Sequence, residues 1–236
     1  MTISRIIIAR EKVKIGLIKS IFKKFSNALL KPSISICLGY CLVCLILISC
    51  GRSPDSQFYV LNPISPQQKP VKKFQHLRIG INEIQSPAYM SKPQFIIHYS
   101  SHEVKLEEFH RWVENLDKNT KRVIEANLVT LLPGVTIVAS PWDFKFKPDY
   151  RLQINISQFE VDIKGNSIFR ADYLIYSGDQ LNKKGSVYYH QKIQIVNVDN
   201  LVASMNENLN HFTEDLAKVF VPLAPQQKDE GAFAVN

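Results

Sequence analysis

The stretch DYRLQINISQFEVDI, residues 149–163, decides the fold, because its apolar residues alternate with polar ones as in a half-buried β-strand. The apolar positions are even-numbered in the first half and odd-numbered in the second: Leu152, Ile154, Ile156, Phe159, Val161 and Ile163. A phase change of one residue within a strand indicates a β-bulge, which we place near Ser157 and Gln158. We therefore predict one long strand that keeps a single apolar face across a bulge.

The residues that follow predict two more strands in an antiparallel meander. Lys164-Gly165-Asn166 is a turn sequence, and apolar residues alternate again from Phe169 to Ile175. A second turn, Asn182-Lys183-Lys184-Gly185, precedes a third alternating segment from Val187 to Val196. Short loops of this kind join neighbouring antiparallel strands.

Shorter strands and one helix are predicted on the N-terminal side. The strand candidates are residues 58–61, 74–84, 94–99, 104–109 and 135–139. Asp117 or Asn119 can cap a helix that runs to about Leu132, where Pro133-Gly134 ends it.

A final helix is predicted from Asp199, its expected cap, to Pro222. Its apolar residues recur every three or four positions: Val202, Met205, Leu209, Phe212, Leu216 and Val219. This stripe is compatible with a coiled-coil seam or with a helix that packs on the sheet. We favour the second interpretation because the stripe covers less than three heptads.

Together these elements predict an α+β fold, namely a two-layer α/β sandwich with two helices packed on one face of a mixed, mainly antiparallel sheet. The other sheet face carries Arg, Asn, Gln and Asp residues, so we expect it to be solvated or bound to a partner. We expect the domain to span residues 74–221 and a disordered tail to span residues 222–236.

The basic character of the chain is confined to its beginning. The formal charge is +8, but residues 1–49 contain eight of the 29 basic residues and one of the 21 acidic ones. From Cys50 onward the net charge is therefore only +1. A near-neutral domain does not favour a polyanionic partner, so we expect no nucleic-acid binding.

Residues 34–49, ISICLGYCLVCLILIS, form an uncharged apolar run that ends at Cys50. Sixteen residues are few for a transmembrane helix but suit a secretory signal, although an uncleaved anchor remains an alternative. Leu47-Ile48-Ser49-Cys50 resembles a bacterial lipobox, in which the cysteine thiol receives a diacylglyceryl group. We expect residues 1–49 to be a signal peptide with an extended basic n-region and residues 50–73 to be a lipidated tether with a short strand.

Cleavage before Cys50 would leave one cysteine in the mature chain, because Cys37, Cys41 and Cys44 all lie in the signal. With that cysteine acylated, neither cysteine catalysis nor a zinc–thiolate site is available. Gly51 follows the cysteine where an inner-membrane retention signal would have Asp, which favours the outer membrane.

The sequence contains no pattern of a catalytic or cofactor site. It has no glycine-rich phosphate-binding motif and no G-x-S-x-G motif. His98, His102 and His110 flank a predicted turn, and adjacent acids such as Glu107 and Glu108 point to opposite faces of a strand. We therefore predict no catalytic residue, no cofactor, no metal site and no enzyme activity.

Large side chains near predicted loops and strand ends are candidates for a partner interface, although such residues are more often part of the core. They are Phe58, Tyr59, Tyr89, Met90, Trp112 and Trp142.

Short motifs occur in a characteristic order along the chain. They are the lipobox Cys50, Phe58-Tyr59-Val60-Leu61, Ser86-Pro87-Ala88-Tyr89-Met90, Pro93-Gln94-Phe95-Ile96, Phe109-His110-Arg111-Trp112, Pro141-Trp142, and Asp149-Tyr150-Arg151-Leu152 followed by Phe159. Residues 50–220 thereby resemble the ABC-type transport auxiliary lipoproteins, the PqiC-like family. The chain departs from the family pattern at Met90 (Leu in the family), Lys92 (Arg) and Asp172-Tyr173 (Trp).

The resemblance implies an outer-membrane lipoprotein on the periplasmic face that assists an MCE-type lipid transport system. It would dock the periplasmic MCE-domain protein without catalysis, and related members imply self-association into a ring. An accessory lipoprotein that regulates peptidoglycan synthesis is the main alternative, but such activators need tethers of many tens of residues, whereas a strand is predicted here from Phe58. A periplasmic hydrolase is a third, less favoured hypothesis.

Overall fold

The structure is a computed structural model that describes residue 39, residues 54–66 and residues 73–224. Its strands are β1 (Gln57–Tyr59), β2 (Arg78–Gln85), β3 (Gln94–His98), β4 (Val104–Trp112), β5 (Thr136–Ala139), β6 (Tyr150–Val161), β7 (Asn166–Ser177) and β8 (Gln180–Lys192). Its helices are α3 (Leu116–Leu131) and α4 (Val198–Phe220), with 3₁₀ turns η1 (Ala88–Ser91) and η2 (Val221–Leu223). The predicted Cys50 lipidation site and the signal lie outside the described residues.

The strands form two mixed sheets, where one sheet was predicted from the sequence. The five-stranded sheet has the order β5-β2-β6-β7-β8, and the three-stranded sheet has the order β1-β4-β3. β2 runs parallel to both of its neighbours, and β1 runs parallel to β4. The longest ladders are the antiparallel pairs β6–β7 and β7–β8, which confirms the predicted meander.

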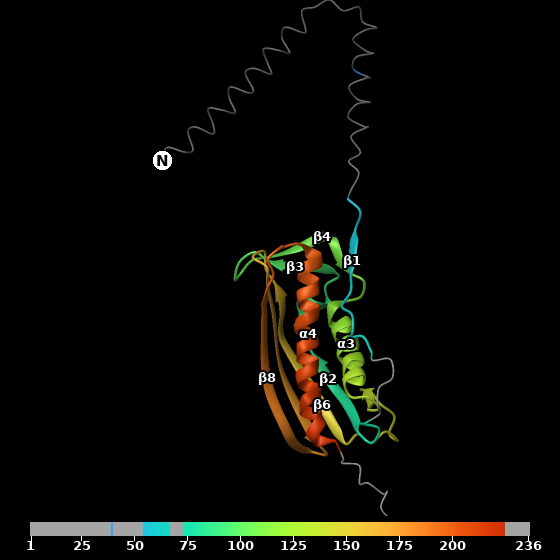
Figure 1. Cartoon of the computed structure of the whole chain (residues 1–236). Helices are drawn as coiled ribbons and strands as arrows, with labels where there is room; N and C mark the ends of the chain where they lie inside the picture. Colours follow the sequence, from blue (N-terminus) through green and yellow to red (C-terminus); the bar gives the residue numbers. More distant parts are fainter. Residues whose placement is uncertain (1–38, 40–53, 67–72, 225–236) are drawn as a thin grey trace, which may run out of the picture. The chain divides into compact units, whose positions relative to one another are not determined.

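The two helices lie side by side on one face of the five-stranded sheet (Figure 1). α4 contacts β6, β7 and β8, and α3 contacts α4 and β5. The buried stripe of α4 includes Met205, Leu209, Phe212 and Leu216. This arrangement confirms the two-layer α/β sandwich and the packing of the second helix on the sheet. No helix in the described part of the chain combines the length and apolarity of a membrane span.

The bulge predicted in β6 is present. The register of β6 against β7 shifts between Ile156 and Gln158. Because of this shift, Ile156 and Phe159 both face the core, with 1% and 2% of their surface exposed.

The two sheets meet at the end of β6, where β2 stops pairing with β6 and β3 approaches it instead. β2 pairs with β6 only as far as Asn155. Further along, His98 of β3 forms an isolated parallel bridge with Asp162, and the Ile163 amide donates to the His98 carbonyl at 3.0 Å. The sequence alternation gives no sign of this exchange, because alternation reports faces and not neighbours.

The helix N-caps predicted from the sequence are wrong by two to four residues. Asn115 and Asn197 occupy these positions, and the Asn197 side chain accepts a hydrogen bond from the Asn200 amide at 2.8 Å. Asp117 and Asp199 instead lie in the first helical turns, where a carboxylate interacts favourably with the helix dipole.

The folded region extends past both predicted boundaries within the described residues. Residues 54–66 precede the expected start at 74, and η2 continues beyond the expected end at 221. The Tyr150 hydroxyl donates to the Leu223 carbonyl at 2.9 Å and ties η2 to β6.

Phe169 of β7 lies where α4 packs on the meander. Its ring centroid is 5.1 Å from those of both Phe159 and Phe212, and the residue is fully buried. Phe144, by contrast, is 83% exposed in the connection between β5 and β6.

Truncation of the aromatic ring at the centre of the core should strongly destabilise the domain. We expect Phe169→Ala to lower the free energy of unfolding by about 3–5 kcal/mol, through lost burial and an unfilled cavity. The control Phe144→Ala should change it by less than about 0.5 kcal/mol. Urea unfolding followed by circular dichroism measures both, and equal effects would contradict this description of the core.

Candidate functional site

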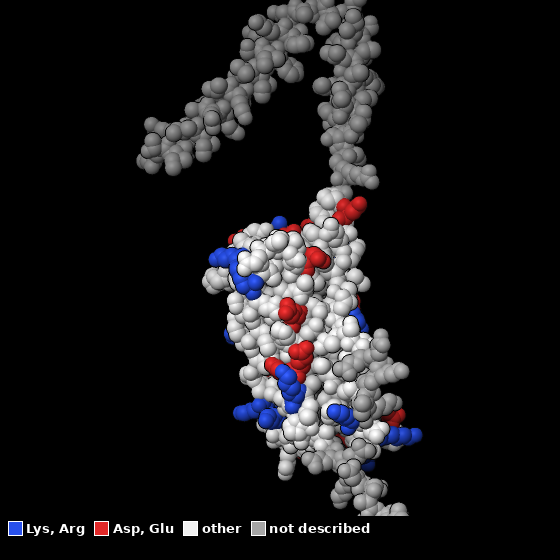
Figure 2. Space-filling model, viewed as in Figure 1, with Lys and Arg blue, Asp and Glu red and all other residues white. Residues whose placement is uncertain are grey.

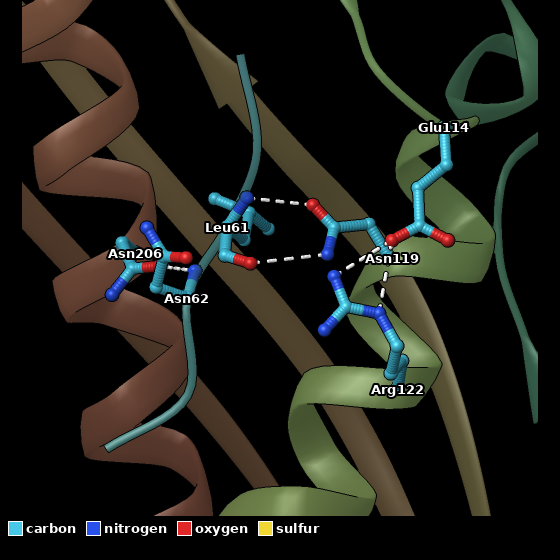
Figure 3. Close-up of polar contacts among 6 residues, drawn as sticks. All are labelled: Leu61, Asn62, Glu114, Asn119, Arg122 and Asn206. Atoms are coloured by element: carbon cyan, nitrogen blue, oxygen red, sulfur yellow. Dashed lines mark hydrogen bonds and ion pairs between the residues drawn. The ribbon is translucent and has the colours of Figure 1, made fainter. Parts of the chain in front are cut away.

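The segment that follows the predicted lipidation site is bound to the helix layer by side-chain amides. The Leu61 amide donates to Oδ1 of Asn119 at 2.6 Å, and Nδ2 of Asn119 donates to the Leu61 carbonyl at 3.1 Å (Figure 3). Both residues are fully buried. The side chain of Asn119 thus replaces a neighbouring strand, because a primary amide offers a donor and an acceptor together.

Two further asparagines continue this contact along the segment. The Asn62 amide donates to Oδ1 of Asn206 on α4, and the Ile64 amide donates to Oδ1 of Asn127 on α3, each at 2.7 Å. Nδ2 of Asn127 donates in turn to Asn210 and Thr213 of α4, each at 2.9 Å. We call Asn119, Asn127 and Asn206 the asparagine clamp.

The spacing of the clamp fits the geometry of the two partners. Leu61 and Ile64 are about 10 Å apart along an extended chain, and Asn119 and Asn127 are about 12 Å apart along a helix. The extended segment therefore runs alongside α3 with matching bond positions. Close by, Arg122 pairs with Glu114 at 2.7 Å on the exposed side of α3, an interaction of small energetic value (Figure 3).

The clamp limits how far the domain can lie from Cys50. The described chain begins at Pro54, four residues after Cys50, so the two are at most about 14 Å apart. Gln57, where β1 begins, is at most about 25 Å from Cys50. Residues 54–66 of the predicted tether are thus part of the domain surface and not a free linker.

Three of the six predicted interface residues pack in or beside the core. Met90 is fully buried and Trp112 is 5% exposed. Trp112 lies 5.3 Å from the Phe95 ring, which also packs against half-buried Tyr59 at 6.2 Å. The Tyr59 hydroxyl lies 2.9 Å from Nδ1 of His110. In this monomer the side chains of Met90 and Trp112 offer almost no surface to a partner.

Tyr89 contacts β6 just beyond the last residue of β6 that pairs with β2. Its hydroxyl accepts a hydrogen bond from the Phe159 amide at 3.0 Å and donates to Glu160 at 3.3 Å. Burial raises the pKa of Tyr89, so the hydroxyl stays protonated. The tyrosine thereby satisfies a backbone amide that β2 no longer reaches.

The last two predicted residues lie on the surface at different places. Phe58 is 62% exposed on β1. Trp142 is half-buried in the connection between β5 and β6, where its ring covers Gly80 and packs edge-on against Phe146 at 6.0 Å. A Cβ at Gly80 would lie 2.9 Å from the Trp142 ring. The absence of a side chain at Gly80 therefore allows the ring to pack against the backbone there. The six residues do not form one site.

A cavity of about 420 Å³ opens where the two sheets meet. Its lining includes His98, Ser100, Glu160, Asp162 and Asn166, and Nε2 of His98 lies 3.7 Å from Glu160. Asp162 accepts three hydrogen bonds within its own turn, from Lys164 and Asn166. Burial alone would raise the pKa of Asp162, but these bonds outweigh it and hold the pKa below its usual value. The Asp162 carboxylate therefore stabilises the turn between β6 and β7.

The three histidines are kept apart. His98 faces Glu160, His110 contacts Tyr59, and the His102 backbone amide donates to Ser100. Among the described residues, no group of three His, Cys, Asp or Glu side chains is arranged to hold a metal ion.

The sequence analysis missed the asparagine clamp and considered Asn119, like Asp117, only as a possible helix cap. Asn127 lies eight residues later in the same helix, and both are fully buried. Two asparagines on the buried part of an amphipathic helix are a signal, because a buried amide needs partners. The sequence did not indicate that the partner was a backbone segment about sixty residues away.

Loss of the buried clamp residue should free the N-terminal segment. Asn119→Ala leaves the Leu61 amide and carbonyl buried without partners, so we expect the free energy of unfolding to fall by at least about 2 kcal/mol. We also expect faster proteolysis between residues 54 and 66. The control Asn206→Ala removes an exposed bond and should cost under about 1 kcal/mol. Equal costs in urea unfolding, or unchanged proteolysis of the Asn119 variant, would contradict the clamp.

Two solved structures that are similar to the chain share its fold at low sequence identity. One is the crystal structure of an uncharacterized protein, with a TM-score of 0.59 and 16% identity, covering 71% of this chain and 99% of that one. Another is protein XCC0632 from Xanthomonas campestris, of the family DUF330, with a TM-score of 0.59 and 10% identity, covering 71% and 95% of the two chains. No curated protein matches the chain in sequence.

A family model gives the assignment directly. The model of the ABC-type transport auxiliary lipoprotein component matches residues 59–217, which includes the clamp, both helices and all strands from β2 to β8. The match covers well over half of the chain and agrees with the resemblance seen in the motifs. The chain therefore belongs to the ABC-type transport auxiliary lipoprotein component family.

Proposed function

We propose that the protein is an outer-membrane lipoprotein, acylated at Cys50, that acts as an accessory component of an MCE-type lipid transport system. In this role it docks the periplasmic MCE-domain partner at the outer membrane and catalyses no reaction itself. Membership of a family of auxiliary transport lipoproteins supports the transport role. The lipobox at residues 47–50 and Gly51 support the anchor and its membrane.

The observation that carries this proposal is the clamped segment. A domain held within about 25 Å of its lipid anchor stays at the membrane surface. Such a position suits a docking element that receives a complex reaching across the periplasm. It does not suit an activator of peptidoglycan synthesis, which must extend far from the membrane to meet its enzyme.

A non-catalytic role agrees with the chemistry of the cavity between the sheets. Asp162 is occupied by its turn, and Glu160 accepts hydrogen bonds from Tyr89 and Gln158.

The lipid anchor is tested by removing its thiol. Once residues 1–49 have been removed, Cys50→Ala should leave the membrane fraction, because several acyl chains anchor a protein almost permanently and nothing else in the mature chain of this proposal does so. The released protein should keep the circular dichroism spectrum of the wild type. Cys44→Ala is the matched control, because it lies in the signal and should leave attachment unchanged. A Cys50→Ala protein that has lost residues 1–49 and still remains in the membrane after a high-salt wash would contradict lipid anchoring at this residue.

The partner is tested by co-purification from membranes solubilised in mild detergent. We expect the acylated protein to retain the MCE-domain protein encoded in the same genome. Cys50→Ala should still bind that partner when both are purified, because the docking surface belongs to the folded domain. Binding to a peptidoglycan synthase in place of the MCE protein would favour the alternative function.

A further inference from the structure

The three-stranded sheet has an apolar face directed away from the core. We call this the outer face; its side chains are Phe58, Ile96, Val104, Leu106, Phe109 and Val113. Val113 and Phe58 are 65% and 62% exposed, and Val104 is 47% exposed. A cluster of large apolar side chains on the surface of a domain marks a contact with a protein or a lipid.

Strand alternation establishes which residues belong to the outer face. Phe95 and Ile97 of β3 are buried, so Ile96 between them points outward. Leu106 is paired with Ile96 and lies on the same side. On β1, Tyr59 packs against Phe95, so Phe58 points outward beside its partner Arg111.

An irregularity in β4 makes the outer face continuous. Phe95 pairs with Glu107 and the adjacent Gln94 pairs with Arg111, so β4 contains extra residues between these pairs. The extra residues shift the alternation of β4, as a bulge does. His110 and Trp112 therefore face the core after the shift, and Phe109 points outward like Leu106 before it.

The five-stranded sheet has a more mixed surface, because β8 exposes Leu181 and Tyr188 among many polar residues. The uncovered side of the five-stranded sheet carries polar pairs, such as Asp172 with Ser186 at 2.5 Å and Arg170 over the Tyr188 ring at 5.0 Å. Figure 2 shows charged side chains of both signs scattered over the helix side of the domain.

Exposed apolar residues of neighbouring loops lie at the same end of the domain. Tyr99 follows the bridge of His98 to Asp162, and Ile163 follows Asp162. Val196 lies close to Gly165 in the adjacent turn. Figure 1 shows β1, β3 and β4 together at the end of the domain where β1 enters it.

We infer that the outer face rests on the bilayer that holds the acyl chains of Cys50, an inference that depends on the lipidation in the proposed function. The chain length is the main argument. Only three residues lie between Cys50 and Pro54, so the acylated residue is within about 14 Å of the end of the domain that carries this face. A short connection gives the face a high effective concentration at the lipid surface, so even weak apolar contacts form.

The charges around the face indicate that the contact is apolar and not electrostatic. Arg111 lies on the outer face beside its partner Phe58, and its long side chain can reach the headgroup phosphates, whereas Lys105 pairs with buried Ile97 and lies on the other side of the sheet. Glu107 and Glu108, their ion-pair partners, balance these charges. The contact should therefore depend little on anionic lipid.

A single fluorophore tests this contact in the acylated protein. Val113→Cys adds the only free thiol of the mature chain, because Cys50 is acylated and the other cysteines leave with the signal. We label it with nitrobenzoxadiazole and reconstitute the protein in vesicles of phosphatidylethanolamine and phosphatidylglycerol. Nitroxides on the lipid chains should quench most of its fluorescence, and aqueous iodide should quench little. The matched control is a label at Phe144→Cys, which is 83% exposed, and the quenching order should be reversed there.

Each other outcome overturns the inference in a distinguishable way. If the protein floats with the vesicles but iodide quenches the label at Val113, lipid anchoring stands and the face is free in water. Protection from both quenchers shows that protein, such as a second copy of this chain, covers the face. Failure to float overturns the lipid anchor together with the inference. Phe109→Glu in the labelled protein should abolish lipid quenching and leave flotation unchanged.

Discussion

Two hydrogen bonds between the side chain of Asn119 and the backbone of Leu61 hold the N-terminal segment on the domain, and the position of the domain at a membrane depends on them. Leu61 is fully buried, so its amide and carbonyl cannot turn to water when the bonds break. Leaving them unpaired costs more than an ordinary hydrogen bond contributes. Asn127 and Asn206 extend the contact, and Asn127 also joins the two helices. The proposed anchor at Cys50 would thereby be connected to the helix layer of the fold.

The attachment of the segment by Asn119 also affects how the two sheets are arranged at one end of the domain. The clamped segment directly follows β1, which pairs with β4 and gives the small sheet its third strand. The same small sheet joins the large one through His98 and Asp162, while Tyr89 satisfies the backbone of β6 between them. The residues of β4 that interrupt its pairing turn Phe109 outward and keep Trp112 inside. The apolar outer face and the cavity thus lie at the same end of the domain as Pro54, and the proposed anchor at Cys50 is at most about 14 Å from that residue.

The spacing of apolar residues within single elements predicted much of the fold. This is possible because the residues of one strand or helix alone determine which of its faces is apolar and packs on the core. The β6 bulge, the meander and the packing of α4 follow from positions such as Ile156, Phe159 and Phe212. Contacts between distant residues leave no such pattern. Asn119 is a reasonable helix cap by sequence, yet its side chain binds Leu61, and Trp112 resembles a surface aromatic until β1 and β3 place it in the core. The division into two sheets was missed because β2 stops pairing with β6 at Asn155. The sequence of β6 contains no signal that its neighbour changes there.

The central claim is that the segment after the lipid anchor is a fixed part of the domain. Hydrogen exchange at the amides of Leu61 and Ile64 in the acylated protein tests it most directly, because both donate to buried asparagines. This account predicts protection close to that of the β6–β7 ladder, since these bonds open only when the helix layer is disrupted. Exchange of both amides at the rate of an unstructured peptide, with the ladder still protected, would contradict it and leave the domain on a free tether.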